Sequence, residues 1–166
     1  MFTTLEKQRS SPVGRVRLLV AGMAVVFAAI ACFPGGQVGQ RAPEFRGIAR
    51  WINSEPLTLE ELQRKVVLVD FWTYTCVNCI RTLPYLKEWH TKYADKGLVI
   101  VGVHSPEFEF EKVTKNVRGA AEEFGLKYPI AQDNLFATWT AYNNRFWPAK
   151  YLLDQEGVVR YTHFGE

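Results

Sequence analysis

The feature that most constrains the fold of this chain is a continuous apolar run, Val66–Trp72, which contains one acid, Asp70, and is soon followed by two cysteines. A run without polar alternation is typical of a strand that is buried on both faces of a sheet. After the cysteines, apolar residues recur at intervals of three or four, which predicts a helix from about Cys79 to Tyr93. A C-x-x-C motif, Cys76 to Cys79, therefore stands between a buried strand and an amphipathic helix.

Strands and helices continue to alternate after this unit. Apolar runs and turn residues predict two more strands, two more helices and a final hairpin around a Gln-Glu-Gly turn. This order predicts an α/β fold with a central mixed sheet flanked by helices. The expected ranges are strands at 98–103 and 128–131, a helix at 107–124 with Phe110, Val113, Val117 and Ala121 inward, a helix at 135–142 capped by Asn134, and hairpin strands at 150–154 and 158–164.

The net charge of +3 does not come from this folded part. Residues 1–17 contain four basic side chains and one acid, whereas the rest of the chain has 16 Lys plus Arg and 16 Asp plus Glu. A nucleic-acid-binding face needs clustered basic residues within the domain, and none is visible. The basic residues instead precede an apolar stretch at 18–33, an order typical of a targeting signal whose positive end stays in the cytoplasm.

The apolar stretch leaves three alternatives open. As a helix it would be about 24 Å long, short of a hydrocarbon core of about 30 Å, so it fits a short signal anchor or a long signal-peptide core. Cleavage after Ala29-Ile30-Ala31 would leave Cys32 at the new N-terminus, where a lipoprotein would also be lipidated. Each alternative exports the domain. Gly and Pro then predict a linker at 34–43, so the folded domain is expected at 44–166.

A single C-x-x-C motif has three explanations: half of a zinc site, a redox pair, or chance. Zinc needs two further ligands at matched spacing, and no metal site is expected because the other candidates are scattered: Cys32, His90, His104 and His163. A redox pair needs the position that the motif has here. At a helix N-terminus, free amide groups and the helix dipole stabilise a thiolate.

This position predicts a different task for each of three groups. Cys76 would be exposed and would attack a substrate disulfide, and Cys79, one turn further on, would resolve the mixed disulfide. Asp70 lies in an otherwise apolar strand, so burial should raise its pKa and let it exchange a proton with Cys79. The alternative is an Asp70 that is exposed at the strand end or paired with Lys65.

Together these motifs resemble the thioredoxin superfamily. The matching features are Val67-Leu68-Val69-Asp70-Phe71-Trp72 before the C-x-x-C, Pro84 five residues after Cys79, and Phe146-Trp147-Pro148-Ala149, which is similar to that superfamily's cis-proline loop. More narrowly, residues 42–166 resemble TlpA/ResA-type redoxins and the thioredoxin-like domain of DipZ-type proteins. That likeness rests on Ala42-Pro43-Glu44-Phe45, Val99-Ile100-Val101-Gly102-Val103, an extra helix–strand segment at Glu107–Asp133, and Leu152-Leu153-Asp154-Gln155-Glu156-Gly157.

The resemblance implies a thioredoxin-like fold with the TlpA-type helix–strand insertion and an activity as a thiol–disulfide oxidoreductase. It makes Cys76 the nucleophile, Cys79 the resolving thiol and Asp70 the buried proton acceptor, with a redox disulfide between the two cysteines. It also implies a substrate-binding surface that contains Trp147, a cis Pro148, Trp72 and Thr75.

The resemblance further implies a setting and partners. The domain would be tethered to a bacterial inner membrane on the periplasmic side, or exported, and would need no cofactor. It would reduce disulfides of protein substrates, with a use in cytochrome c maturation, and draw electrons from a membrane donor of the CcdA or DsbD type.

Departures from the family pattern keep two other functions open. Thr75 stands where the family usually has Trp, Val77-Asn78 contains no proline, and no covering C-terminal helix is expected after the hairpin. A sheet face without that helix predicts lower stability. Thr73 stands three residues before Cys76, as in peroxiredoxins, so a thiol peroxidase is one alternative. A redox-inactive binding module is the other.

Overall fold

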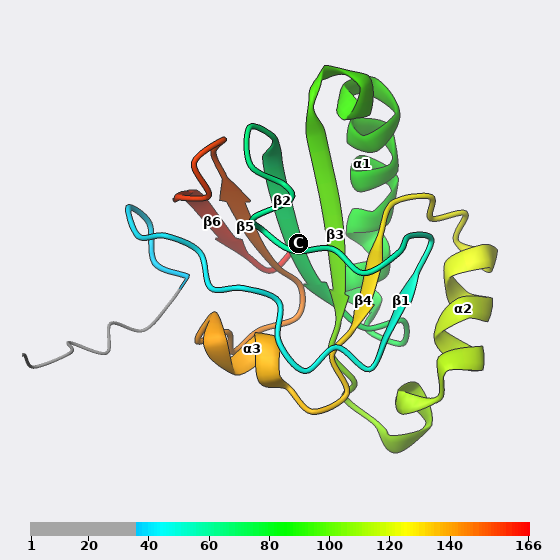
Figure 1. Cartoon of the computed structure of the whole chain (residues 1–166). Coiled ribbons are helices and arrows are strands. Elements are labelled where there is room, and N and C mark those ends of the chain that lie inside the picture. Colours follow the sequence, from blue (N-terminus) through cyan, green and yellow to red (C-terminus); the bar gives the residue numbers. More distant parts are fainter. Residues whose placement is uncertain (1–35) are drawn as a thin grey trace, which may run out of the picture. The chain divides into compact units, whose positions relative to one another are not determined.

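The computed structural model of this chain describes residues 36–166, which form a six-stranded sheet with helices on both faces (Figure 1). The expected basic leader at 1–17, the apolar stretch at 18–33 and the possible lipidation site Cys32 lie outside the described residues. The strands are β1 (Arg50–Ile52), β2 (Val66–Trp72), β3 (Leu98–His104), β4 (Ile130–Gln132), β5 (Ala149–Leu153) and β6 (Val159–Phe164). The helices are α1 (Val77–Tyr93), α2 (Thr114–Glu123) and α3 (Ala137–Ala141), with short 3-10 turns η1 (Ala94–Lys96) and η2 (Glu109–Lys112).

The sheet is mixed, as the sequence predicts. Its strand order is β1-β4-β3-β2-β5-β6. β2 pairs with β3 and β3 with β4 in parallel, whereas β1 pairs with β4, β5 with β2, and β6 with β5 in antiparallel fashion. The parallel pairs require crossover connections, which α1 and the α2 segment supply.

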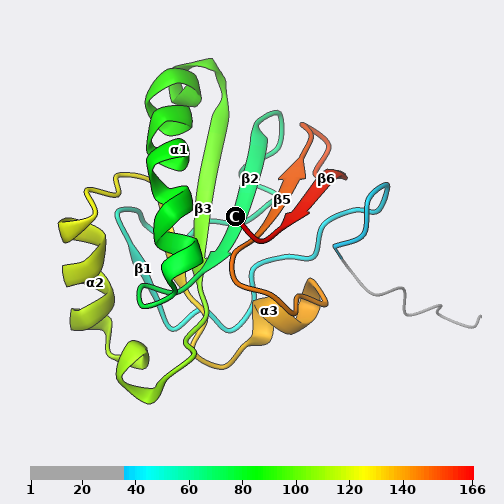
Figure 2. The same cartoon turned by 180° about the vertical axis from the view of Figure 1, so that it is seen from behind.

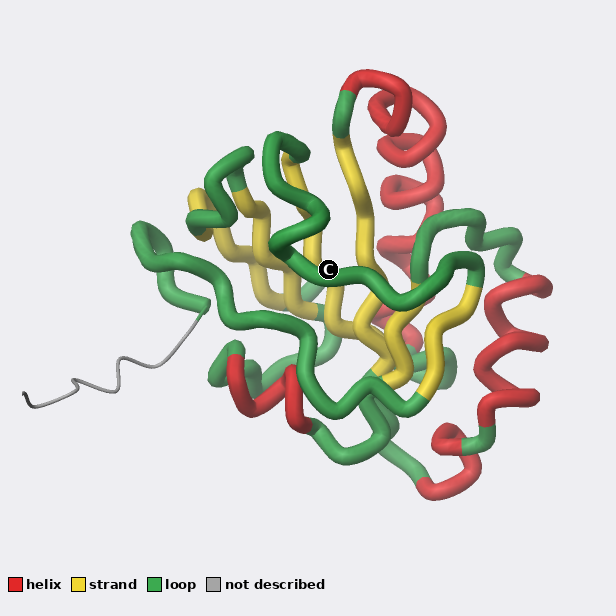
Figure 3. The backbone as a smooth tube through the Cα atoms, viewed as in Figure 1, coloured by secondary structure: helices red, strands yellow, loops and turns green. Residues whose placement is uncertain are grey.

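Strand β2 is buried on both faces, which explains its lack of polar alternation. Leu68 and Trp72 belong to one apolar cluster, together with Leu83 and Leu86 of α1. Val67, Val69 and Phe71 belong to the opposite cluster, which irregular segments before and after β1 and Trp139 of α3 help to cover (Figure 3). Since successive side chains of a strand alternate between faces, Asp70 must point to the same side as Leu68 and Trp72, under α1 (Figure 2).

The segment predicted as one helix at 107–124 is two elements. Turn η2 ends at Lys112, Val113 is extended (φ −77°, ψ 111°), and α2 begins at Thr114. Of the four residues expected to face inward, Val117 and Ala121 are buried, but Phe110 and Val113 are exposed. The break arises because Glu111, a charged residue within the predicted helix, turns inward to accept backbone hydrogen bonds at Glu107 and Phe108.

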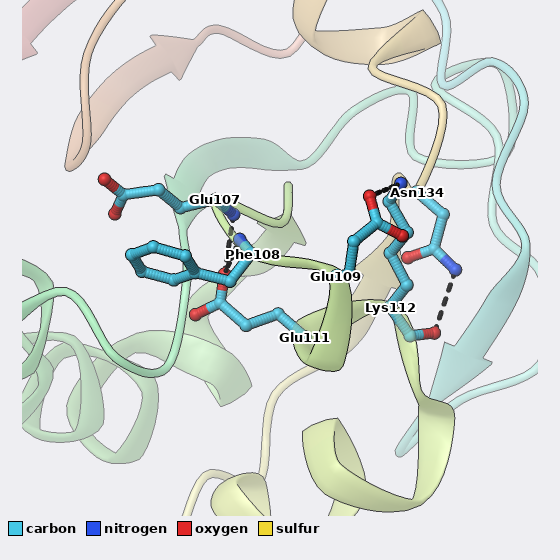
Figure 4. A network of polar contacts seen from close by, with 6 residues as sticks. All are labelled: Glu107, Phe108, Glu109, Glu111, Lys112 and Asn134. Carbon is cyan, nitrogen blue, oxygen red and sulfur yellow. Dashed lines mark hydrogen bonds and ion pairs between the residues drawn. The ribbon is translucent and has the colours of Figure 1, made fainter.

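Helix α3 is capped by Asp133 and not, as predicted, by Asn134. Both oxygens of the Asp133 carboxylate accept backbone N–H groups of α3, at 2.8 Å from Ala137 and 2.8 Å from Trp139. Asn134 instead donates to the carbonyl of Lys112 at 3.0 Å (Figure 4). Both residue types cap helices well, so the sequence could not distinguish them.

The described part of the expected linker, residues 36–43, is attached to the sheet. The amide of Gly39 donates to the Val159 carbonyl at 2.8 Å, and that of Ala42 donates to the Gly157 carbonyl at 2.8 Å. Arg41 also forms a bridge with Val158. These bonds extend the folded unit to residues before the expected boundary at 44.

Beside α1, a groove of about 690 Å³ is bordered by residues of α1, β2, β5 and β6. Within residues 36–166, no helix follows β6, and no helix is long and apolar enough to cross a membrane. The groove is lined mainly by apolar and aromatic side chains, among them Leu68, Tyr85, Trp89, Tyr93, Leu152 and Tyr161.

Replacing either of two glycines by alanine should have opposite effects on stability. A Cβ on Gly102 in β3 would lie 2.9 Å from Nε1 of Trp72 and 3.2 Å from the ring of Tyr128, so Gly102→Ala should lower the free energy of unfolding by about 1–3 kcal/mol. Gly119 in α2 has nothing within 4 Å of that position, and Gly119→Ala should raise the free energy of unfolding by about 0.5–1 kcal/mol. Urea unfolding measures both, and equal effects of the two substitutions would contradict this packing.

Candidate active site

The two cysteines lie where β2 leads into α1, and their environments differ. Cys76 is half-buried and caps the helix, because its Sγ accepts the amide hydrogen of Cys79 at 3.3 Å. Cys79 is fully buried in the cluster under α1, and both residues are free thiols. Burial, the hydrogen bond with Cys76 and the nearby charge of Asp70 raise the pKa of the Cys79 thiol well above its usual range. The structure therefore contains one accessible and one protected sulfur.

Asp70 is fully buried in β2, and its partner is Lys150 of β5 rather than Lys65. The two residues are directly opposite in the antiparallel register, and Lys150 Nζ lies 3.1 Å from Asp70 Oδ1. Burial raises the pKa of Asp70, although the ammonium group of Lys150 opposes that shift. The charge of Asp70 is felt at Cys79, since it contributes to the raised pKa of that thiol.

Sequence reasoning missed Lys150, which connects the acid to the cysteine helix. Its Nζ lies 3.3 Å from the hydroxyl of Thr82, and that hydroxyl donates to the carbonyl of Cys79 at 2.9 Å. The available signal was a lysine within the otherwise apolar β5 run, whose burial demands a buried acid as partner. Asp70 was the candidate to match it.

The loop before β5 has the expected cis peptide bond between Trp147 and Pro148. Trp147 is half-buried, packs against Trp139 with ring centroids 4.2 Å apart, and donates from Nε1 to the Ser105 carbonyl at 3.0 Å. Cys76 and Trp147 both pack against the cluster that contains Cys79. The amide of Ser105 in turn donates to the carbonyl of Trp72 at 3.0 Å, so the cis-proline loop lies at the end of β2 that leads to the cysteines.

Two other residues expected on the substrate surface differ from each other. Trp72 is fully buried, so it supports the site from below and has no exposed surface that a substrate could contact. Its position at the end of β2, facing α1, explains this. Thr75 is exposed, but its hydroxyl donates to the carboxylate of Glu111 at 2.6 Å.

Under the turn that precedes Cys76 lies a second buried pair, Thr73 and His104, whose contact the sequence did not predict. His104 is fully buried, stacks under Tyr74 with centroids 5.6 Å apart, and its Nε2 lies 3.2 Å from the hydroxyl of Thr73. Burial lowers the pKa of His104 to about 4, so its ring is neutral near pH 7. Thr73 is also fully buried, so its hydroxyl does not face solvent beside Cys76.

Within residues 36–166, no three Cys, His, Asp or Glu side chains gather closely enough to hold a metal ion. The chemistry that this arrangement supports is thiol chemistry: an accessible sulfur at a helix N-terminus, a buried sulfur one turn behind it, and a buried acid with a raised pKa nearby.

The match to known proteins agrees with this geometry. Residues 37–166 match the Redoxin family pattern. The chain belongs to the redoxin family. Together with its relatives and its fold, this membership makes it a thioredoxin-like protein of the TlpA/ResA type.

Three relatives illustrate the range of similarity. Protein DipZ of Mycobacterium tuberculosis (strain CDC 1551 / Oshkosh) is 51% identical over 128 residues, which cover 75% of this chain but 18% of that protein. Thiol-disulfide oxidoreductase YkuV of Bacillus subtilis (strain 168) is 31% identical over 126 residues, covering 76% of this chain and 84% of YkuV. A thioredoxin-like protein solved in solution in its oxidized form has a TM-score of 0.71 at 33% identity, covering 76% and 85% of the two chains. The chain thus corresponds to less than a fifth of DipZ.

The buried pair predicts an unusual dependence of stability on pH. Because the pKa of Asp70 is raised on folding, the folded state loses stability as pH rises from the unfolded value of about 3.8 through the folded pKa. The neutral double variant Asp70→Asn, Lys150→Met should therefore have a free energy of unfolding about 1–4 kcal/mol higher than that of the wild type at pH 7. Urea unfolding measures this difference. The difference should shrink as pH is lowered toward 4.

Asp154 supplies a control of opposite sign. Backbone hydrogen bonds, chiefly at Val158, and the ion pair with Arg160 lower the pKa of this half-buried acid. The destabilisation caused by Asp154→Asn should therefore be largest near neutral pH and fade as pH is lowered. A difference in the free energy of unfolding between the double variant at Asp70 and Lys150 and the wild type that does not shrink as pH is lowered from 7 toward 4 would contradict the direction assigned to Asp70.

Proposed function

We propose that this domain reduces disulfide bonds of partner proteins through a dithiol–disulfide cycle of Cys76 and Cys79. One observation carries the proposal: the half-buried Cys76 caps α1, while Cys79 lies fully buried one turn behind, with its amide 3.3 Å from Cys76 Sγ. This arrangement exposes one sulfur to a substrate and reserves the other for the second step.

In the first step, the Cys76 thiolate attacks one sulfur of a substrate disulfide. A bond forms between Cys76 Sγ and that sulfur, the substrate S–S bond breaks, and the other substrate sulfur leaves as a thiolate. The amide groups and dipole at the start of α1 stabilise the attacking thiolate. The backbone at Trp147, before the cis Pro148, aligns an extended substrate segment in this proposal.

In the second step, Cys79 gives its proton to Asp70 and attacks Cys76 Sγ, the bond between Cys76 and the substrate sulfur breaks, and the substrate leaves as a second thiolate. The proton held by Asp70 and one proton from water then protonate the two substrate thiolates. The substrate thus gains two electrons and two protons, and the protein ends with a Cys76–Cys79 disulfide. A base is needed because burial raises the pKa of Cys79, so this thiol is protonated near pH 7. Asp70 is suited to this task because its own pKa is raised by burial.

The proposed direction and setting come from the family likeness. A domain of the TlpA/ResA type would draw electrons from a membrane thiol transporter of the CcdA or DsbD kind, with cytochrome c maturation as one use. The basic residues 1–17 followed by the apolar residues 18–33 support a place outside the cytoplasm. Failure of a membrane-impermeant thiol reagent to label Cys76 in intact cells would contradict that location.

Neither alternative function is favoured by a specific contact. A peroxidase would need Thr73 to hold a peroxide beside Cys76, but Thr73 is fully buried and its hydroxyl contacts His104. A redox-inactive binding module does not explain why a free thiol pair lies over a buried acid.

Equilibration in glutathione buffers tests the direction of the reaction. The Cys76–Cys79 pair is expected to have a potential near that of thioredoxin, about −270 mV, because the proposed task is reduction. Quenching with acid and alkylating the free thiols gives the oxidised fraction. A potential near about −120 mV would identify an oxidant instead, and a pair that never forms a disulfide would rule out redox function.

Trapping of mixed disulfides tests the roles of the three residues. Cys79→Ser should accumulate a covalent complex with a disulfide-containing protein such as oxidised insulin, because the second step is blocked. Cys76→Ser is the matched control and should trap nothing. Asp70→Asn should prolong the life of the mixed disulfide about 10- to 100-fold near pH 7 by removing the base; unchanged kinetics would remove Asp70 from the mechanism.

A further inference from the structure

Glu111 is a fully buried acid for which the two-step reaction has no task. It lies in η2, within the helix–strand insertion, and none of the ion pairs among residues 36–166 includes it. Acidic side chains are almost never fully buried unless other groups satisfy them. The groups that satisfy Glu111 connect two separate segments of the chain.

One oxygen of the Glu111 carboxylate accepts hydrogen bonds from the insertion. The other accepts them from the turn that precedes α1, residues 73–76. Oε2 accepts the amide hydrogens of Glu107 at 2.6 Å and Phe108 at 2.9 Å (Figure 4). Oε1 accepts the hydroxyl of Thr75 at 2.6 Å and lies 3.4 Å from the Thr75 amide nitrogen. Thr75 immediately precedes Cys76, so the carboxylate contacts the residue next to the nucleophile.

Glu111 remains ionised in this position. Burial by itself would raise its pKa, but the hydrogen bonds from the side chains of Thr73 and Thr75 and from the amides of Phe108 and Glu107 outweigh burial and lower it. Hydrogen bonds to an ionised acceptor are about twice as strong as neutral ones. The ionised carboxylate of Glu111 therefore binds the hydroxyl of Thr75 strongly.

A second contact joins the same two segments. The hydroxyl of Tyr74 donates to the Phe110 carbonyl at 3.4 Å, and the two rings lie 6.3 Å apart. Within the turn at residues 73–76, one backbone hydrogen bond lies near the nucleophile: the amide of Cys76 donates to the Thr73 carbonyl at 3.3 Å. The insertion therefore supplies much of what holds this turn.

We propose that Glu111 is a positioning residue of the redox site, whose carboxylate fixes Thr75 and, through it, the backbone that carries Cys76. The inference rests on the proposed exchange chemistry of Cys76 and Cys79. It gives the insertion a function: residues 107–112 set the geometry of a cysteine pair that lies in another part of the sequence.

The consequence is greatest for the intramolecular disulfide. Closing that bond requires Cys76 Sγ to meet Cys79 Sγ, and a fixed turn raises the effective concentration of one thiol at the other. Loss of Glu111 should therefore shift the equilibrium toward the dithiol.

The test is the equilibrium constant for disulfide formation with glutathione, measured for matched variants. Glu111→Gln keeps the length of the side chain but removes its charge, and should lower this constant about tenfold. Thr75→Val removes the hydroxyl alone and should lower the constant about fivefold. Thr75→Ser keeps the hydroxyl, so its constant should stay within about twofold of the wild-type value. Glu109→Gln, at the exposed acid of the same turn that pairs with Lys112, should leave it unchanged.

A double variant and the thermal midpoint of each variant distinguish a positioning role of Glu111 from a general structural role. Glu111→Gln together with Thr75→Val should lower the constant no further than Glu111→Gln does alone, because both remove one contact. A lower thermal midpoint with an exchange constant within about twofold of the wild type in both single variants would overturn the proposal. If Glu111→Gln does not fold, Thr75→Val alone decides. A wild-type protein that forms no Cys76–Cys79 disulfide at any glutathione ratio would instead refute the proposed function.

Discussion

The burial of β2 between two apolar layers is the constraint on which the rest of the structure depends. A strand covered on both faces has no room for an unpartnered charge, yet β2 contains Asp70. Side-chain alternation directs this acid to the α1 face, where Lys150 from the neighbouring strand meets it at 3.1 Å. The same alternation places Asp70 under the helix that carries Cys79. The acid, its partner and the buried thiol are thus consequences of one strand being central.

The end of that strand determines where thiol chemistry can occur. The chain leaves β2 at Trp72 and enters α1 at Val77, so the intervening turn lies at a helix N-terminus with free amide groups. A cysteine that caps the helix is partly accessible, and a cysteine three residues later is inside. Turns of this kind have few backbone bonds, and here the insertion adds the Glu111 carboxylate to hold Thr75. Reactivity and positioning therefore come from different parts of the chain.

Local patterns predicted the elements of this site well. The continuous run at 66–72, the C-x-x-C motif and the periodic helix were all recognisable, because each depends on residues close together in the sequence. Predictions failed where a distant group competes with local preference. The helix expected at 107–124 is broken because Glu111 binds two amides of its own turn and the distant Thr75, and the cap of α3 is Asp133 because its carboxylate faces three amides.

The sequence by itself determined the mixed α/β sheet, the redox pair at a strand–helix junction and the buried acid in the central strand, since periodicity and spacing are local properties. Tertiary structure alone decided that Lys150 is the partner of Asp70, that Trp72 supports the site from inside, and that Glu111 reaches Thr75. Those contacts join residues between 36 and 80 positions apart, and only the register of strands and the path of loops brings such residues within hydrogen-bond distance.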